Sequence, residues 1–137
     1  MVVIDANMLV ALVSGDTRGN QVLQSFTDWL NHNVEIYAPA LAKYEFANAL
    51  TRLIVGGLFP IDKVEDAWNN VSLIPVEYRE MANAKRVVEI ALALNRQNAY
   101  DASYIALAES LGAELWTLDG PLYRSALGLG FVVNLIS

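Results

Sequence analysis

The sequence predicts an α/β protein with one domain over residues 1–137 and a parallel sheet of about five strands. Its 137 residues fit one domain and leave little room for a second. The candidate strands are short, continuous apolar runs, which is typical of strands buried on both faces. These runs alternate with longer segments of helical periodicity, and that alternation favours a parallel sheet covered by helices.

The candidate strands are apolar runs delimited by turn or breaker residues. The first is β-branched and ends at Asp5, and the second stops at Pro39, whose missing N–H ends strand pairing. The predicted strands are Val2–Ile4, Val34–Ala38, Leu73–Val76, Glu114–Leu118 and Phe131–Leu135.

The candidate helices have apolar residues at every third or fourth position. Gly56-Gly57 and Gly112 mark two helix ends, and Pro60 suits the entrance of another helix. The predicted helices are Asn7–Val13, Gly19–Asn31, Ala40–Val55, Ile61–Val71, Arg79–Leu94 and Tyr100–Leu111.

The composition restricts the chemistry that this chain can perform. Hydrophobic residues make up 55% and charged residues 18%, which excludes a disordered chain. There is no cysteine, so disulfides and thiolate sites are excluded, and His32 alone cannot form a two-histidine acid–base pair. Any catalysis therefore depends on carboxylates, hydroxyls, amides and cations.

The net charge of −6 repels nucleic acid at long range. Acids that bind a metal ion no longer contribute to that repulsion, so the charge does not exclude a nucleic-acid substrate. No apolar run approaches about eighteen residues, and the start of the chain lacks the basic segment of a secretory signal. We therefore expect a soluble cytoplasmic protein.

Two acids directly follow predicted strands. Asp5 ends the first strand and Asp119 follows the fourth, so both are expected at the carboxyl edge of the sheet, where α/β sheets bind ligands. Each has a local alternative. Asp5 can cap the next helix, and Asp119-Gly120-Pro121 is typical of a turn.

Two further acids lie in predicted helices. Neither Glu45 nor Asp101 has a basic residue three or four positions away, so neither makes the usual helical ion pair. The alternatives are a solvated side chain for Glu45 and a capping box with Asn98 for Asp101.

Four such acids in one cleft would repel one another. Two carboxylates roughly 4 Å apart cost about 4 kcal/mol at an effective dielectric constant of about 20. Mg²⁺ or Mn²⁺ relieves this repulsion, because both ions take oxygen ligands and need only one or two protein carboxylates. A water on such an ion can attack a phosphodiester. The acids therefore indicate a metal site suited to nucleic-acid hydrolysis.

Three segments stand in the order and spacing of a known family: VVIDANMLVAL, APALAKYEFANAL and NAYDASYIALAESLGAELWTLD. The sequence resembles the PIN-domain ribonucleases, and within them the small VapC-like toxins of prokaryotic toxin–antitoxin pairs, over the whole chain. The last segment is the most specific, because an acid opens an Ala- and Leu-rich helix, and a glycine then precedes a strand that ends in Thr-x-Asp.

The resemblance implies a PIN-like three-layer α/β/α fold with strand order 3-2-1-4-5, Mg²⁺ or Mn²⁺ dependence, a homodimer, and a cognate antitoxin whose tail fills the groove beside the active site. Asn7 and Thr117 match polar positions that assist the site. Residues 120–124 contain no acid where some relatives carry one, which weakens the expectation of a second metal ion. The implied catalytic and metal-binding residues are Asp5, Glu45, Asp101 and Asp119.

Cations near the predicted cleft are candidates for holding RNA. Of the basic residues, Arg52, Arg96 and Arg124 are the predicted phosphate contacts, although scattered cations also serve solubility alone. Arg18 and Lys43 stand on segments that adjoin the same cleft.

We expect a metal-dependent endoribonuclease, the toxin of a toxin–antitoxin pair. A catalytically silent PIN-like module that binds RNA or protein is an alternative, because the motif shows metal-binding capacity and not turnover. A housekeeping RNA-processing nuclease is another. A haloacid-dehalogenase-like phosphatase fits less well because it needs a second Asp in place of Asn7. A receiver-like domain needs a Lys that residues 131–137 lack.

Overall fold

The sheet at the centre of the molecule is parallel and has five strands. The computed structural model describes residues 1–137. The strands lie in the order β3-β2-β1-β4-β5, and each neighbouring pair is parallel. The predicted fold class and strand order are therefore confirmed. The strands are β1 (Val2–Ile4), β2 (Ile36–Pro39), β3 (Val76–Arg79), β4 (Glu114–Thr117) and β5 (Val133–Leu135).

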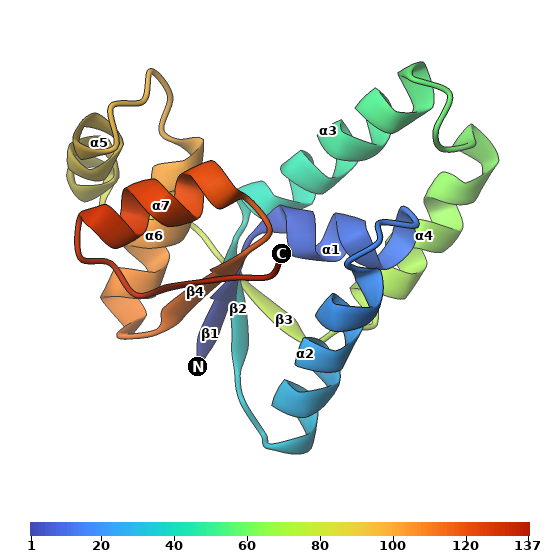
Figure 1. The fold of residues 1–137 in the computed structure, drawn as a ribbon, viewed down its shortest axis with the longest axis horizontal. Coiled ribbons are helices and arrows are strands. Elements are labelled where there is room, and N and C mark those ends of the chain that lie inside the picture. Colours follow the sequence, from blue (N-terminus) through green and yellow to red (C-terminus); the bar gives the residue numbers. More distant parts are fainter.

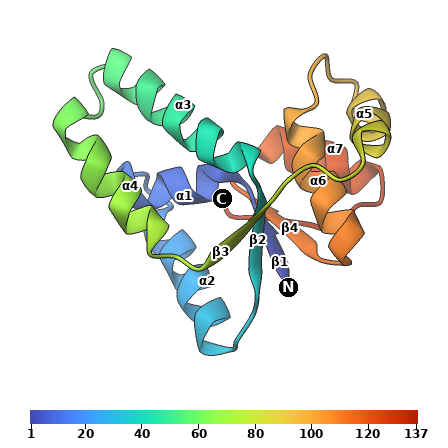
Figure 2. The ribbon, with the colours of Figure 1, turned by 180° about the vertical axis from the view of Figure 1, so that it is seen from behind.

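Helices cover both faces of this sheet (Figures 1 and 2). The chain crosses the sheet in one direction from β1 to β3 and returns past β1 to β4, so right-handed connections place α1–α4 and α5–α7 on opposite faces. None of the helices combines the length and the apolar character needed to span a bilayer. The helices are α1 (Ala6–Val13), α2 (Gly19–Asn31), α3 (Leu41–Val55), α4 (Val64–Ser72), α5 (Ala84–Ala93), α6 (Tyr100–Leu111) and α7 (Gly120–Gly128), and a 3-10 turn, η1 (Ile61–Lys63), precedes α4.

The core lies on both sides of β1, whose three residues are all buried. Side chains from the two helical layers meet the sheet there and exclude water from both of its faces. The order of the strands reverses between β1 and β4, so their carboxyl ends border the crevice where α/β folds place their ligands. The largest fully buried side chains include Ile4, Met8, Phe46, Leu50, Ile90, Tyr104, Ile105, Leu115 and Leu122.

The prediction for the third strand was wrong by three residues. The predicted run Leu73–Val76 is apolar, but Leu73 ends α4, and Pro75 has no N–H to donate to β2. β3 is an edge strand, and its residues alternate between half-buried and exposed. A continuous apolar run is required only of a strand enclosed on both faces, so the search for such runs did not identify this edge strand.

Two helix predictions also need correction. The helix predicted from Arg79 begins at Ala84, because Arg79 belongs to β3 and the Asn83 carboxamide oxygen accepts a hydrogen bond of 3.0 Å from the Arg86 N–H. The helix α7 was not predicted, because Asp119-Gly120-Pro121 was interpreted as a turn. An acid followed by proline also begins a helix, and the structure uses it in that way.

The end of α6 gives a prediction about stability. Gly112 follows α6 in the left-handed region, with φ at 63°, and its N–H closes the helix end on Ala108 and Glu109. A Cβ is unfavourable at this φ, so we expect Gly112→Ala to lower the free energy of unfolding by about 1 kcal/mol.

Gly128 provides the control. It lies in α7 without a positive φ, and a Cβ there meets no atom within 4 Å. Gly128→Ala should leave the free energy of unfolding unchanged or raise it by at most about 1 kcal/mol. Urea unfolding of both variants measures the difference. Equal effects at the two positions would contradict this account of Gly112.

Candidate active site

Asp5 lies at the carboxyl end of the central strand, next to β4. Ile4 pairs with Trp116, so Asp5 comes opposite Thr117, and the Asp5 N–H donates to the Trp116 carbonyl at 2.9 Å. The Thr117 hydroxyl donates to Asp5 Oδ2 at 2.8 Å. Asp5 is 9% exposed and Thr117 is fully buried, so this hydrogen bond is shielded from water. The Asp5 carboxylate does not cap α1, which contradicts the local alternative.

Asn7 links the same carboxylate to β4. Its amide nitrogen donates to Asp5 Oδ2 at 3.1 Å and to the Thr117 hydroxyl at 3.3 Å. Its amide oxygen accepts from the Leu118 N–H at 3.2 Å. The structure thus brings together Asp5, Asn7 and Thr117, three of the residues that the sequence singled out.

Asp119 begins α7 two residues after Thr117. Its Oδ1 accepts from the Leu122 N–H at 3.0 Å, and its own N–H donates to the Thr117 hydroxyl at 3.0 Å. Its Oδ2 accepts no hydrogen bond from the protein. Asp119 is therefore a helix cap with one carboxylate oxygen left for another partner.

Glu45 lies in the second turn of α3 and is half-buried. The Tyr104 hydroxyl of α6 donates to Glu45 Oε1, so Glu45 is not simply a solvated side chain. Tyr104 was not picked out from the sequence. The signal for it was a large hydroxyl-bearing residue three positions after Asp101 in an apolar helix, because a buried tyrosine needs a partner for its hydroxyl.

Asp101 lies in the first turn of α6 and is also half-buried. Its Oδ2 is 3.9 Å from Arg96 Nε, a cation that precedes the helix. The Asn98 side chain accepts from the Tyr100 N–H at 3.3 Å and makes no hydrogen bond to Asp101, so the alternative of a capping box does not apply.

Burial and neighbouring charges raise the pKa values of Asp5, Glu45 and Asp101. Burial raises the pKa of Asp5 to about 7, and the charges of Glu45 and Asp101 add to that effect, while the Thr117 hydrogen bond opposes it. Burial and Asp101 raise the pKa of Glu45. Burial raises the pKa of Asp101, Arg96 lowers it, and Asp119 adds a smaller rise. Asp5, Glu45 and Asp101 therefore lie near enough for their charges to affect one another, and Asp119 lies near Asp101.

The donor set suits a hard divalent ion that keeps much of its water. All four groups are carboxylates, and burial raises the pKa values of Asp5, Glu45 and Asp101, although Arg52 and Arg96 partly offset this rise at Glu45 and Asp101. No three of them converge closely enough to enclose an ion by themselves. Mg²⁺ and Mn²⁺ fit this arrangement, because one or two carboxylates and several waters complete their coordination.

The three predicted phosphate contacts all lie near the acids. Arg52 is exposed on α3 and its charge lowers the pKa of Glu45. Arg96 lies beside Asp101. The exposed Arg124 folds over Gly120, where its guanidinium would lie 3.1 Å from an added Cβ.

Two other cations near the cleft have partners of their own. Arg18 is paired with Asp16 at 3.0 Å and donates to the Leu118 carbonyl at 3.0 Å, so it supports the end of β4. Lys43 lies 4.6 Å from the centre of the Tyr78 ring.

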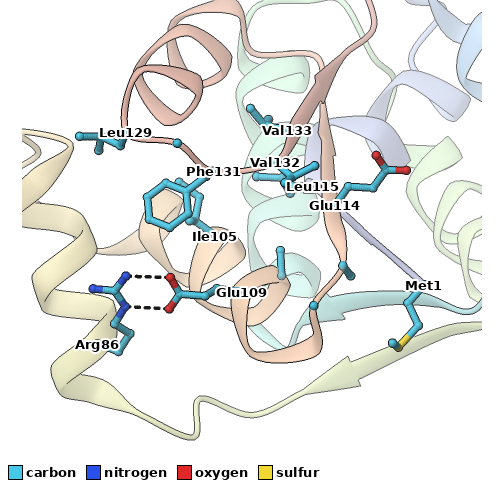
Figure 3. Close-up of a pocket in the computed structure, with 14 residues that line it drawn as sticks. Met1, Arg86, Ile105, Glu109, Glu114, Leu115, Leu129, Phe131, Val132 and Val133 are labelled. Atoms are coloured by element: carbon cyan, nitrogen blue, oxygen red, sulfur yellow. Dashed lines mark hydrogen bonds and ion pairs between the residues drawn. The ribbon is translucent and has the colours of Figure 1, made fainter.

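The larger of the two main cavities lies away from these acids (Figure 3). It measures about 720 Å³ and is bordered by Met1 and Glu114 at the amino ends of β1 and β4, together with the ion pair of Arg86 and Glu109 at 2.7 Å. None of the predicted site residues lines it. The candidate site is therefore identified by its carboxylates and not by the size of a cavity.

The buried Asp5 carboxyl gives a prediction about pH. With its pKa raised to about 7, it keeps its proton in the folded protein up to about pH 7, whereas the unfolded chain loses it near the ordinary aspartate pKa of 3.8. The folded state then binds more protons than the unfolded state, so stability falls as the pH rises through this window. We expect Asp5→Asn, which has no such titration, to be more stable than the wild type at pH 8, by up to about 4 kcal/mol.

Near pH 4 the two proteins should have similar stabilities. Urea unfolding in EDTA at both pH values measures the difference. A stability gain that is the same at pH 4 and pH 8 would show that the charge of Asp5 is not its source.

Comparisons with known proteins agree with this geometry. A family model described as the PIN domain matches residues 2–126, which include every predicted site residue. Ribonuclease VapC3 of Pyrobaculum aerophilum is 32% identical over 126 residues, which cover 88% of this chain and 90% of that protein. Ribonuclease VapC9 of Mycobacterium tuberculosis is 29% identical over 122 residues, which cover 87% of this chain and 86% of that protein.

The crystal structure of PAE2754 from Pyrobaculum aerophilum has the same fold, with a TM-score of 0.69 and 25% sequence identity. The superposition covers 96% of this chain and 81% of that chain. Sequence, sheet order and solved structure thus agree with the resemblance inferred from the three segments, and the chain belongs to the PIN domain family.

Proposed function

We propose that this protein is a metal-dependent endoribonuclease that hydrolyses RNA phosphodiester bonds. The observation that carries the proposal is the electrostatic coupling of Asp5, Glu45 and Asp101, with Asp119 coupled to Asp101, on four segments of the chain. Carboxylates that raise one another's pKa values are suited to Mg²⁺ or Mn²⁺. The names of the VapC relatives, which are ribonucleases, support RNA as the substrate.

The metal ligands in this proposal are Asp5, Glu45, Asp101 and Asp119. A bound ion supplies an activated water and neutralises charge on the phosphate. Asn7 and Thr117 hold the Asp5 carboxylate in one orientation, since both donate to its Oδ2. This preset geometry lowers the entropic cost of assembling the site around substrate and ion.

The substrate in this proposal is held by cations at the rim of the site. Arg52, Arg96 and Arg124 lie on three different segments around the acids. Each contributes a guanidinium, which suits phosphate oxygens. Together they offset the repulsion between an acidic protein and the RNA backbone.

The proposal includes a role as the toxin of a toxin–antitoxin pair, acting as a homodimer with a cognate antitoxin. The VapC name of the relatives supports this role. Exposed apolar side chains at the tip of the α3–α4 hairpin support a protein partner, because contact with a partner would remove their apolar surface from water. They are Val55, Leu58 and Ile61.

A silent PIN-like binding module and a housekeeping nuclease remain the alternative functions. The first would need no turnover, although a buried Asp5 carboxylate beside the half-buried Glu45 and Asp101 is costly to keep charged. The second would share the chemistry and differ in its RNA target. Cleavage assays separate the first from the proposal.

Cleavage of RNA by the purified protein tests the chemistry. We expect cleavage with Mn²⁺ or Mg²⁺, none in EDTA, and at least a hundredfold slower cleavage by Asp5→Asn and by Asp101→Asn, because each loses a charged ligand. Asp62→Asn is the matched control. Asp62 is an exposed acid in η1, and its loss should leave the rate unchanged.

Activity that survives EDTA or Asp5→Asn would contradict the proposed mechanism. Mn²⁺ binding without cleavage of any RNA would favour the binding module.

Binding of RNA tests the cationic rim. We expect Arg124→Ala to weaken RNA binding several-fold and to reduce the slope of log affinity against log salt by about one, because one phosphate contact is lost. Arg86→Ala is the control, because Arg86 lies at the distal cavity, paired with Glu109. Fluorescence anisotropy in EDTA at several salt concentrations measures both quantities. Equal salt slopes for Arg124→Ala and the wild type would remove Arg124 from the RNA contacts.

A further inference from the structure

The hydroxyl of Tyr104 is a buried polar group that the proposed chemistry does not use. Tyr104 lies on α6, one turn after Asp101, and is 1% exposed. It is the largest of the fully buried side chains. A buried tyrosine hydroxyl must find a hydrogen-bond partner, and the choice of that partner is informative.

The partner of Tyr104 is a carboxylate on another helix. Its hydroxyl donates to Glu45 Oε1, and this is the only hydrogen bond made by the Glu45 side chain. The Ala6 backbone lies near the same hydroxyl and partly offsets the rise in the Tyr104 pKa. Because Ala6 follows Asp5, the hydroxyl lies between the segment that carries Asp5 and the helix that carries Glu45.

The electrostatics of this position favour the same arrangement. The charges of Asp5 and Glu45 both raise the pKa of Tyr104, after the larger effect of burial, so the hydroxyl remains a donor. Without that donor, the half-buried Glu45 carboxylate would face the charge of Asp101 with no hydrogen bond to hold it. A glutamate has several rotatable bonds, and repulsion would turn it outward.

We propose that Tyr104 is a positioning residue that holds the Glu45 carboxylate toward Asp5, so that a divalent ion binds without first having to order Glu45. This inference rests on the proposed function, in which Glu45 is a metal ligand. The hydrogen bond occupies Oε1 and leaves Oε2 for the ion. Tyr104 thereby acts on metal affinity through Glu45 and does not itself touch the substrate.

Tyr104→Phe tests this role, because it keeps the buried ring and removes only the hydroxyl. We expect Mn²⁺ binding, measured by calorimetry on the full chain without RNA, to weaken by about tenfold or more, as for other groups that orient metal ligands. RNA cleavage should then need more Mn²⁺, and its rate at saturating Mn²⁺ should approach that of the wild type.

Tyr37→Phe is a matched control. The Tyr37 hydroxyl also donates to a glutamate, Glu35, on a different part of the sheet, and Tyr37 is nearly buried as well. This variant loses the same kind of hydrogen bond away from the acids, so its Mn²⁺ affinity should match the wild type. A purely structural role for tyrosine–glutamate bonds would instead give both variants the same behaviour.

A double-mutant cycle with Glu45→Gln shows whether Tyr104 acts through Glu45. In the Glu45→Gln background, Tyr104→Phe should cause little further loss of Mn²⁺ affinity. Additive losses would overturn the proposed route. So would an unchanged Mn²⁺ affinity in Tyr104→Phe alone, or a Tyr104→Phe chain that no longer unfolds cooperatively, since the hydroxyl would then serve folding.

Measurements on the wild type distinguish a failure of this inference from a failure of the proposed function. A wild-type protein that neither binds Mn²⁺ nor cleaves RNA overturns both. A wild-type protein that does both, with a Tyr104→Phe variant that matches it, overturns only the role of Tyr104.

Discussion

The burial of Asp5 beside the half-buried carboxylates of Glu45 and Asp101 is the constraint on which the site depends. Asp5 is held at the end of the central strand, out of water, and its pKa rises to about 7 because burial penalises its charge and the charges of Glu45 and Asp101 add to that penalty. Such a cluster is unfavourable until a cation neutralises it. The groups around it reduce that cost in part: Thr117 and Asn7 donate to Asp5, and Tyr104 donates to Glu45.

The parallel sheet is what brings these acids together. β1 and β4 are neighbours although more than a hundred residues separate them, and the helices that follow β1 and β3 lie on opposite faces. The carboxyl ends of the two strands therefore open between the helical layers (Figure 1). α3 brings Glu45 from one layer, and α6 brings Asp101 and Tyr104 from the other. The single hydrogen bond between Tyr104 and Glu45 joins the two layers at the site.

The acidic charge of the whole chain and the proposed RNA substrate are compatible for a local reason. The acids of the site face one region, and guanidinium groups on three segments surround it. In the proposed function, a metal ion at the acids and cations at the rim would present a local potential unlike that of the remaining surface. The net charge of −6 describes the molecule at long range and not the site.

The sequence by itself determined the fold class, the strand order through its resemblance, and the four acids. Continuous apolar runs identify buried strands because both of their faces must exclude water, and acids at strand ends or without helical partners stand out against that pattern. The local sequence pattern gave wrong predictions at two places. β3 is an edge strand with one open side, so it is not a continuous apolar run. Asp119-Gly120-Pro121 is compatible both with a turn and with the start of α7.

Only the tertiary structure decided which groups partner the acids. Tyr104 lies 59 positions from Glu45, and Thr117 lies 112 positions from Asp5. No local spacing encodes those hydrogen bonds, because they depend on the register of β1 against β4 and on the packing of α6 beside the sheet. The orientation of each carboxylate, and with it the readiness of the site for an ion, is a property of contacts between distant segments.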